Sequence, residues 1–119
     1  MDKPTERFWL ALEKLVHQSQ IVIDRPKGAR HPSSAEILYP VDYGYLKSTT
    51  SMDRQGIDVW RGSDRNGKID AIICTVDLRK KDSEIKVLIG CTEGEKKLIL
   101  AFHNHGDMSG IMVRRETFL

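Results

Sequence analysis

Apolar residues near the start of the chain recur at helical spacing. Between Pro4 and Gln18 they occupy positions i, i+1, i+4, i+7 and i+8, which are Phe8, Trp9, Leu12, Leu15 and Val16. Residues at these intervals lie along one stripe of an α-helix. We therefore predict an amphipathic helix whose apolar stripe covers one side of a sheet.

Most other apolar runs are short and bounded by glycine, proline or charged residues, which is typical of strands. These predicted strands are Ile21–Asp24, Ile37–Leu46, Ile57–Arg61, Ile69–Leu78 and Ile85–Ile89. Residues 25–36 and 79–84 are expected to be loops, and Asn66-Gly67 predicts a hairpin between the strand at Ile57 and the one at Ile69. The segment Ile111–Arg115 is predicted to be a final short strand or an extended tail.

Thr92 and Glu95, three positions apart, match a helix capping box. They predict a second helix reaching about residue 105, with Gly106 as its stop. Short strands flanked by two helices predict an α+β fold in a single domain, residues 1–119. Its architecture is expected to be a small, mainly antiparallel β-barrel, closed or partly open.

Composition and charge argue against a nucleic-acid partner and against a membrane-spanning segment. The formal net charge is only +2, with acids and bases interspersed, whereas a nucleic-acid partner requires a concentrated basic face. No apolar run approaches the roughly 18 residues that span a membrane, and the N-terminal segment lacks a signal-peptide apolar core. Cys74 and Cys91 lie in apolar strands, which favours buried free thiols over a disulfide and indicates a reducing cytoplasm.

Most of the candidate catalytic and metal-binding residues lie between Tyr39 and Arg61. Tyr43 and Tyr45 share one face of a strand, because side chains alternate along it. The segment 48–56 is a polar turn that carries Asp53, and Asp58 follows just inside the next strand. Two carboxylates and a tyrosine at one edge suit Mg²⁺, which prefers oxygen ligands. The alternative is that both acids only form turns and that the tyrosines are half-buried aromatics.

This stretch resembles the soluble family I inorganic pyrophosphatases. In that family a YPxxYGY-like segment precedes Asp-x-Asp-Pro-x-Asp, whose three acids hold metals and activate the attacking water. Here the chain reads Asp53-Arg54-Gln55-Gly56-Ile57-Asp58. The outer acids match and Gln55 replaces the middle one. Because an amide cannot accept a proton at neutral pH, the resemblance implies slower catalysis unless Asp24 or Glu84 acts as the base.

The resemblance also implies roles outside that segment. Asp24 stands where the family has an active-site glutamate, and Tyr43 matches a tyrosine at the phosphate pocket. Glu84-Ile85-Lys86 resembles Asp-x-Lys, in which the acid binds metal and the lysine contacts phosphate. Asp82 is a further candidate metal ligand. The family's hairpin with phosphate-binding Lys and Arg residues is missing, and Arg30 or Lys27 is expected to replace that charge.

Two functional classes follow. The first is a Mg²⁺-dependent hydrolase of inorganic pyrophosphate or a related small phosphoanhydride in the cytoplasm; the resemblance implies a homo-oligomer. The second is a non-catalytic relative that binds an anion or a protein. A small barrel that binds single-stranded nucleic acid is a third alternative, which the charge balance and the 7% aromatic content disfavour.

The histidines are not expected to form a metal site. His103 and His105 are two positions apart on a predicted helix, about 200° around its axis. Their positive forms at the helix end would instead interact favourably with the helix dipole, and His17 is interpreted in the same way. His31, beside Arg30 in the loop that faces the predicted cleft, is the one histidine for which phosphate contact is an alternative.

Overall fold

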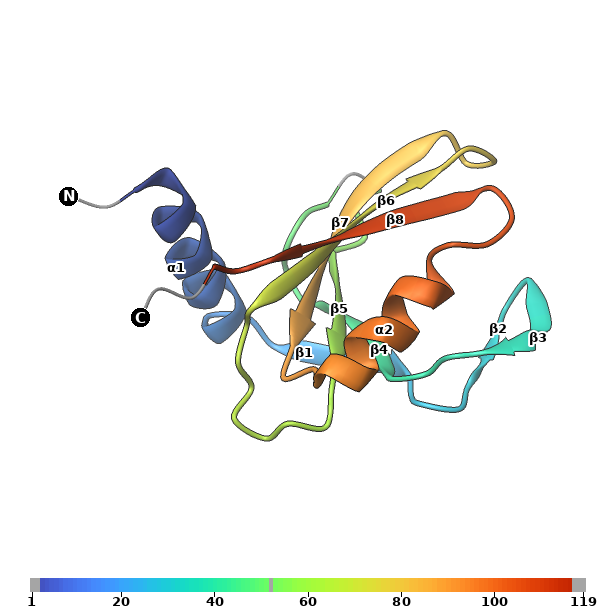
Figure 1. Ribbon diagram of the computed structural model, residues 1–119, viewed down its shortest axis with the longest axis horizontal. Coiled ribbons are helices and arrows are strands. Elements are labelled where there is room, and N and C mark those ends of the chain that lie inside the picture. The colour runs from blue at the N-terminus through green and yellow to red at the C-terminus, as the bar shows by residue number, and fades with distance from the viewer. Residues whose placement is uncertain (1–2, 52, 117–119) are drawn as a thin grey trace.

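A computed structural model describes residues 3–51 and 53–116 of the chain (Figure 1). Met52, inside the predicted 48–56 turn, lies outside the described residues. Over the described part the chain forms two helices and eight strands. In chain order they are α1 (Pro4–His17), β1 (Ile21–Arg25), β2 (Arg30–His31), β3 (Ser34–Leu38), β4 (Asp42–Leu46), β5 (Ile57–Arg61), β6 (Ala71–Asp77), β7 (Asp82–Ile89), α2 (Glu93–Phe102) and β8 (Met108–Arg114).

Six strands form one mixed sheet in the order β1-β4-β5-β7-β6-β8, and β2 and β3 form a separate hairpin. Only the β5–β7 pair is parallel among the described strands. The fold is therefore α+β with a mainly antiparallel sheet, as predicted. The described strands do not close into a barrel, because β1 and β8 are the two edges of an open sheet.

Strand β7 joins the two halves of this sheet. It pairs with β6 from Asp82 to Leu88, and its last residues, Val87 to Ile89, also pair with β5. In Figure 1 it runs from beside β6 and β8 down to β5. Side chains on β7 therefore lie next to side chains from both halves of the sheet, β1-β4-β5 on one side and β6-β8 on the other.

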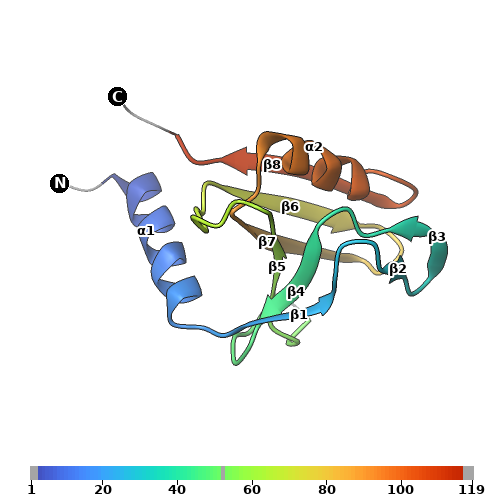
Figure 2. The same cartoon turned by 90° about the horizontal axis from the view of Figure 1, so that it is seen from below.

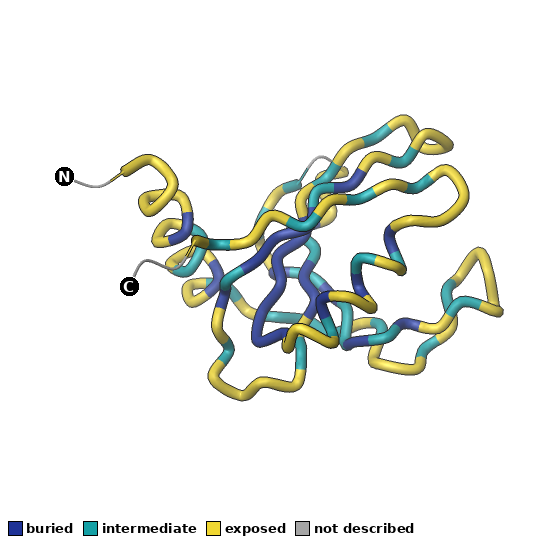
Figure 3. The backbone as a smooth tube through the Cα atoms, viewed as in Figure 1, coloured by how far each residue is buried: buried dark blue, intermediate teal, exposed yellow. Residues whose placement is uncertain are grey.

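The sheet buries a core on each face, because alternate residues of a strand point in opposite directions. On β5, Val59 packs with Trp9 of α1, whereas its neighbour Trp60 packs with Ile99 of α2. The two helices thus cover opposite faces, and they lie apart in Figure 2. Figure 3 shows buried residues concentrated in the central strands, whereas much of α1 and the β2–β3 hairpin is exposed.

Several boundaries differ from the sequence prediction. The predicted hairpin at Asn66-Gly67 is wrong, because β5 pairs with β4 and β7 and not with β6. A two-residue turn needs strands that begin at the turn, and here residues 62–70 separate β5 from β6. The predicted strand 37–46 is broken at Pro40, which lacks a backbone N–H donor.

Other local predictions can be compared with the structure. The supposed 79–84 loop is a tight turn, so Asp82 already belongs to β7. The capping box is confirmed: Thr92 accepts the Glu95 N–H, and the Glu95 carboxylate accepts the Thr92 N–H. The final segment is a strand, and both cysteines are free. No helix in the described part of the chain is long and apolar enough to cross a membrane.

Candidate functional site

A cavity of about 560 Å³ opens on the face of the sheet that α2 covers farther along. Strands β1, β4, β5, β6, β7 and β8 and the segment 48–56 all contribute to its lining. The position follows from strand alternation: Asp58 lies two residues before Trp60 on β5, and Lys86 two residues before Leu88 on β7. The cavity is therefore the polar continuation of the core under α2.

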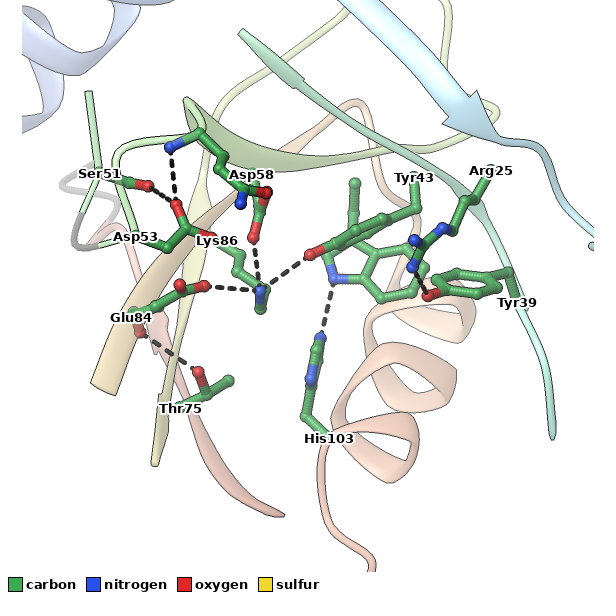
Figure 4. Close-up of polar contacts among 12 residues, drawn as sticks. Arg25, Tyr39, Tyr43, Ser51, Asp53, Asp58, Thr75, Glu84, Lys86 and His103 are labelled. Atoms are coloured by element: carbon green, nitrogen blue, oxygen red, sulfur yellow. Dashed lines mark hydrogen bonds and ion pairs between the residues drawn. The ribbon is translucent and has the colours of Figure 1, made fainter. Parts of the chain in front are cut away.

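Lys86 lies at the centre of the site (Figure 4). Its Nζ donates to Asp58 Oδ2 at 2.7 Å, to Tyr43 Oη at 2.8 Å and to Glu84 Oε2 at 3.1 Å. Only 8% of its side chain is exposed. Burial alone would lower the pKa of Lys86, but the hydrogen bond to the Tyr43 oxygen and the Asp58 carboxylate outweigh it and raise that pKa above its ordinary value. Lys86 is therefore a charged ammonium in the resting site.

The acids beside Lys86 differ in proton affinity. Burial raises the pKa of Glu84, partly offset by Lys86, and the charges of Asp58 and Asp53 raise it further. In contrast, the Ser51 hydroxyl and the Gln55 N–H hold the pKa of Asp53 below its ordinary value, through hydrogen bonds of 2.6 and 2.9 Å. Glu84 therefore accepts a proton more readily than Asp53 does.

Burial also raises the pKa of Tyr43, so its phenol stays protonated at neutral pH. Its ring packs edge-on against Trp60, with centroids 4.6 Å apart. Tyr43 and Tyr45 both line the cavity, which confirms that they share one face of the strand. Tyr43 thus presents a neutral hydroxyl, fixed by packing, beside the Lys86 ammonium.

The structure brings most of the predicted site residues to this cavity. Its lining includes the predicted metal ligands and catalytic residues Asp24, Asp53, Gln55, Asp58, Asp82 and Glu84, together with the predicted substrate ligands Tyr43 and Lys86. Arg30 is not among them. It lies in the β2–β3 hairpin, where its guanidinium donates to the Ala35 carbonyl at 2.7 Å, because that hairpin projects away from the sheet (Figure 1).

Sequence reasoning missed further lining residues, among them Asp77 and Arg25. Asp77 faces Asp82 across the β6–β7 hairpin, and like charges directly opposite each other destabilise a strand pair. Asp77 also accepts the N–H groups of Arg79 and Lys80, which stabilises the turn. The alternation Thr75, Asp77 along β6 was a sequence signal that could have placed Asp77 on this face.

His103 behaves differently from the sequence interpretation. It is 3% exposed, and its Nε2 accepts the indole N–H of Trp60 at 3.1 Å. Burial, with a smaller effect of the Lys86 charge, lowers the pKa of His103 to about 3. His103 is therefore a neutral core residue and does not carry the positive charge expected at a helix end. His31 does not line the cavity; it stacks on Tyr39 at 5.9 Å.

The described residues contain no group of three His, Cys, Asp or Glu side chains arranged around a common point. The cavity's donors are nevertheless carboxylate oxygens, the ligand type that Mg²⁺ prefers. Mg²⁺ keeps several waters and binds one or two carboxylates together with substrate phosphates. The donor chemistry therefore fits Mg²⁺ without a preformed protein cage.

Comparisons with known proteins identify no relative: no family model, no curated protein and no solved structure matches the chain. The resemblance to pyrophosphatases accordingly rests on the motif residues of the sequence alone.

Proposed function

We propose that this protein is a Mg²⁺-dependent hydrolase of inorganic pyrophosphate or a related small phosphoanhydride in the cytoplasm. One observation carries the proposal: carboxylates from separate elements line one cavity together with Lys86 and Tyr43. Pyrophosphate has a dense negative charge, so its hydrolysis needs cations at both phosphates and a positioned water. This cavity combines acids that suit a cation with donors that suit phosphate oxygens.

The residues would divide these tasks as follows. Asp53 and Asp58 would hold Mg²⁺, with Glu84 and Asp82 contributing to a second position. When bound, Mg²⁺ would supply charge stabilisation for the phosphates. Tyr43 would donate to a phosphate oxygen. Lys86, whose three N–H donors bond to Asp58, Glu84 and Tyr43, would donate to phosphate by exchanging one of these bonds.

Proton transfer is the weakest part of this machinery. Gln55 lines the cavity and can orient a water through its amide, but it cannot accept the proton. Glu84 is the better candidate base, because its pKa is raised and a base is most effective when its pKa is near the working pH. Asp24, an exposed residue at the rim, is the second candidate. We therefore expect slow turnover.

The proposal extends to the fold and the assembly. We interpret the sheet as an opened, OB-like barrel of the pyrophosphatase type, in which β7 pairs with β6 along most of its length and with β5 at its end. A homo-oligomer is the assembly that the resemblance implies.

The second candidate function is a non-catalytic relative that binds an anion or a protein. Two observations favour it: Gln55 in place of an acid, and the Lys86 ammonium bonded to both Asp58 and Glu84. That ammonium already neutralises part of the acidic charge, so an anion could enter the cavity without catalysis.

A phosphate-release assay with pyrophosphate and MgCl₂ separates the two functions. The wild-type protein should release phosphate. The rate of release should be roughly 100-fold or more lower for Asp58→Asn and higher than wild type for Gln55→Asp. Thermal melts of each variant check folding. No release by any of the three proteins would favour the binding role, and undiminished release by Asp58→Asn would contradict the assigned site.

A further inference from the structure

Arg25 reaches the cavity because β1 is irregular. In a regular strand Asp24 and Arg25 would point to opposite faces. The pairing of β1 with β4 instead shifts register between Ile23 and Arg25, and both Asp24 and Arg25 line the cavity. Bulges of this kind often redirect a side chain beside a functional site.

The Arg25 guanidinium is held by Tyr39. Its Nη1 donates to Tyr39 Oη at 2.8 Å, and its Cζ lies 5.7 Å from the centre of the Tyr39 ring. Tyr39 is only 3% exposed, because it packs against Phe102 and Trp60 with ring centroids 4.9 and 5.9 Å away. The core under α2 therefore fixes the orientation of the guanidinium.

Among the described residues, Arg25 makes few of the hydrogen bonds that its guanidinium can donate. A guanidinium has five N–H donors, and the hydrogen bond found here goes to Tyr39. None of the ion pairs of the described residues includes Arg25. By contrast, Lys86 already bonds to Asp58, Glu84 and Tyr43. Figure 4 draws Arg25 and Lys86 on either side of the Tyr43 ring. Arg25 is therefore an oriented cation in a cavity rich in acids: the charge of Asp24 acts on it, but it forms no ion pair with any acid of the described residues.

We infer that Arg25 is a phosphate-binding residue of this cavity and supplies the charge that the resemblance to pyrophosphatases assigned to Arg30 or Lys27. A planar guanidinium bonds two phosphate oxygens at once. This inference rests on the proposed function for its ligand class, a diphosphate, but it concerns binding and can be tested without turnover.

The test is calorimetric titration with methylenediphosphonate, a diphosphate analogue that is not hydrolysed, with and without MgCl₂. Arg25→Gln should bind roughly 30-fold more weakly, because charged hydrogen bonds to the phosphonate are lost. Arg25→Lys should recover part of that loss, since it restores the charge but not the planar fork. Arg65→Gln, which removes an exposed arginine outside the cavity, controls for net charge.

Two further variants keep the test decisive if Arg25→Gln is unstable. Tyr39→Phe removes only the hydroxyl that orients Arg25 and should weaken binding a few-fold. Arg30→Gln tests one of the two residues, Arg30 and Lys27, to which the resemblance assigned this charge. With pyrophosphate as substrate, Arg25→Gln should raise KM more than it lowers kcat.

The outcomes separate this inference from the hydrolase proposal. Binding that depends on Arg25 without phosphate release would uphold the inference and overturn the hydrolase. Phosphate release with Arg25→Gln binding as tightly as wild type would overturn the inference alone, and so would a loss confined to Arg30→Gln. A wild-type protein that neither binds nor hydrolyses would overturn both.

Discussion

The neutral imidazole of His103 makes stability depend on pH. The histidine has a pKa near 6.5 in the unfolded chain and about 3 in the folded protein, where it is buried. Below pH 6.5 the unfolded state therefore binds a proton that the native state does not. The His103 contribution is fully present above pH 6.5 and is lost as pH falls toward 3.

We predict that this loss reaches roughly 2 kcal/mol in the free energy of unfolding between pH 7 and pH 5. Urea unfolding of wild type and His103→Gln at both pH values measures it. The introduced glutamine cannot titrate but can still accept the Trp60 N–H, so the variant should show the smaller fall. Equal falls for wild type and His103→Gln would contradict the burial argument.

Sequence patterns predicted part of the site at the level of residues. Alternation along strands put Tyr43 with Tyr45, and the resemblance to pyrophosphatases brought in Glu84 and Lys86. Alternation failed for Arg25, because a bulge in β1 leaves no periodic signal in the sequence. Strict alternation would place Arg25 on the other face of the sheet. His103 was misread because its burial depends on Trp60, a residue far away in the chain.

At the scale of elements, the position of Asp24 and Arg25 depends on how closely β1 lies against β4. Gly44 is a point of close contact between them: a Cβ there would lie 1.8 Å from the Val22 carbonyl oxygen and 2.8 Å from Ile23 Cα. Both neighbours are backbone atoms, which cannot turn aside as a flexible side chain can. A side chain at position 44 would therefore push β1 off the sheet.

We predict that Gly44→Ala lowers the free energy of unfolding by roughly 3 kcal/mol or more, by analogy with overpacked cores. Gly94→Ala is the matched control. In α2 a Cβ at Gly94 would find its nearest neighbour, Thr92 Oγ1, at 3.9 Å, so alanine should be neutral or stabilise the helix by up to about 1 kcal/mol. Chemical denaturation of the two variants measures both effects. If Gly44→Ala were as stable as Gly94→Ala, the close approach of β1 and β4 would be refuted.

Most element types were predictable and strand partners were not. The expected loop at residues 25–36 was wrong, because it contains β2 and the start of β3, and α2 ends at Phe102, before the predicted residue 105. The helix in α1, the cap of α2 and the limits of β5 all followed from local patterns. The parallel pairing of β5 with β7 had no local signal, because it depends on burying Val59 and Trp60 on opposite faces of the sheet at once. Asn66-Gly67 suggested a nearer partner that the length of the connection excludes.

At the scale of the whole molecule, the candidate site links the two halves of the sheet. Lys86 on β7 bonds to Asp58 on β5 and Tyr43 on β4, and it also bonds to Glu84, which pairs with Thr75 on β6. Removing one partner of a buried ion pair is strongly destabilising, because the opposite charges remain uncompensated. The Lys86 ammonium therefore contributes to holding the halves together, and it occupies a position that suits a cation.

We predict that Lys86→Met lowers the melting temperature by roughly 10 °C and that millimolar MgCl₂ restores part of the loss. The reason is that Asp58 and Glu84 would face each other without a counter-charge, so a cation that binds the folded state stabilises it by mass action. The matched control is Lys96→Met. Lys96 is also buried and paired, with Asp70 and Glu93, but lies outside the cavity. Lys96→Met should also have a lower melting temperature than wild type, but MgCl₂ should not raise it by a comparable amount. Equal responses of the two variants to MgCl₂ would show that the cavity acids do not attract the cation, and the metal-dependent reading of the site would then fail.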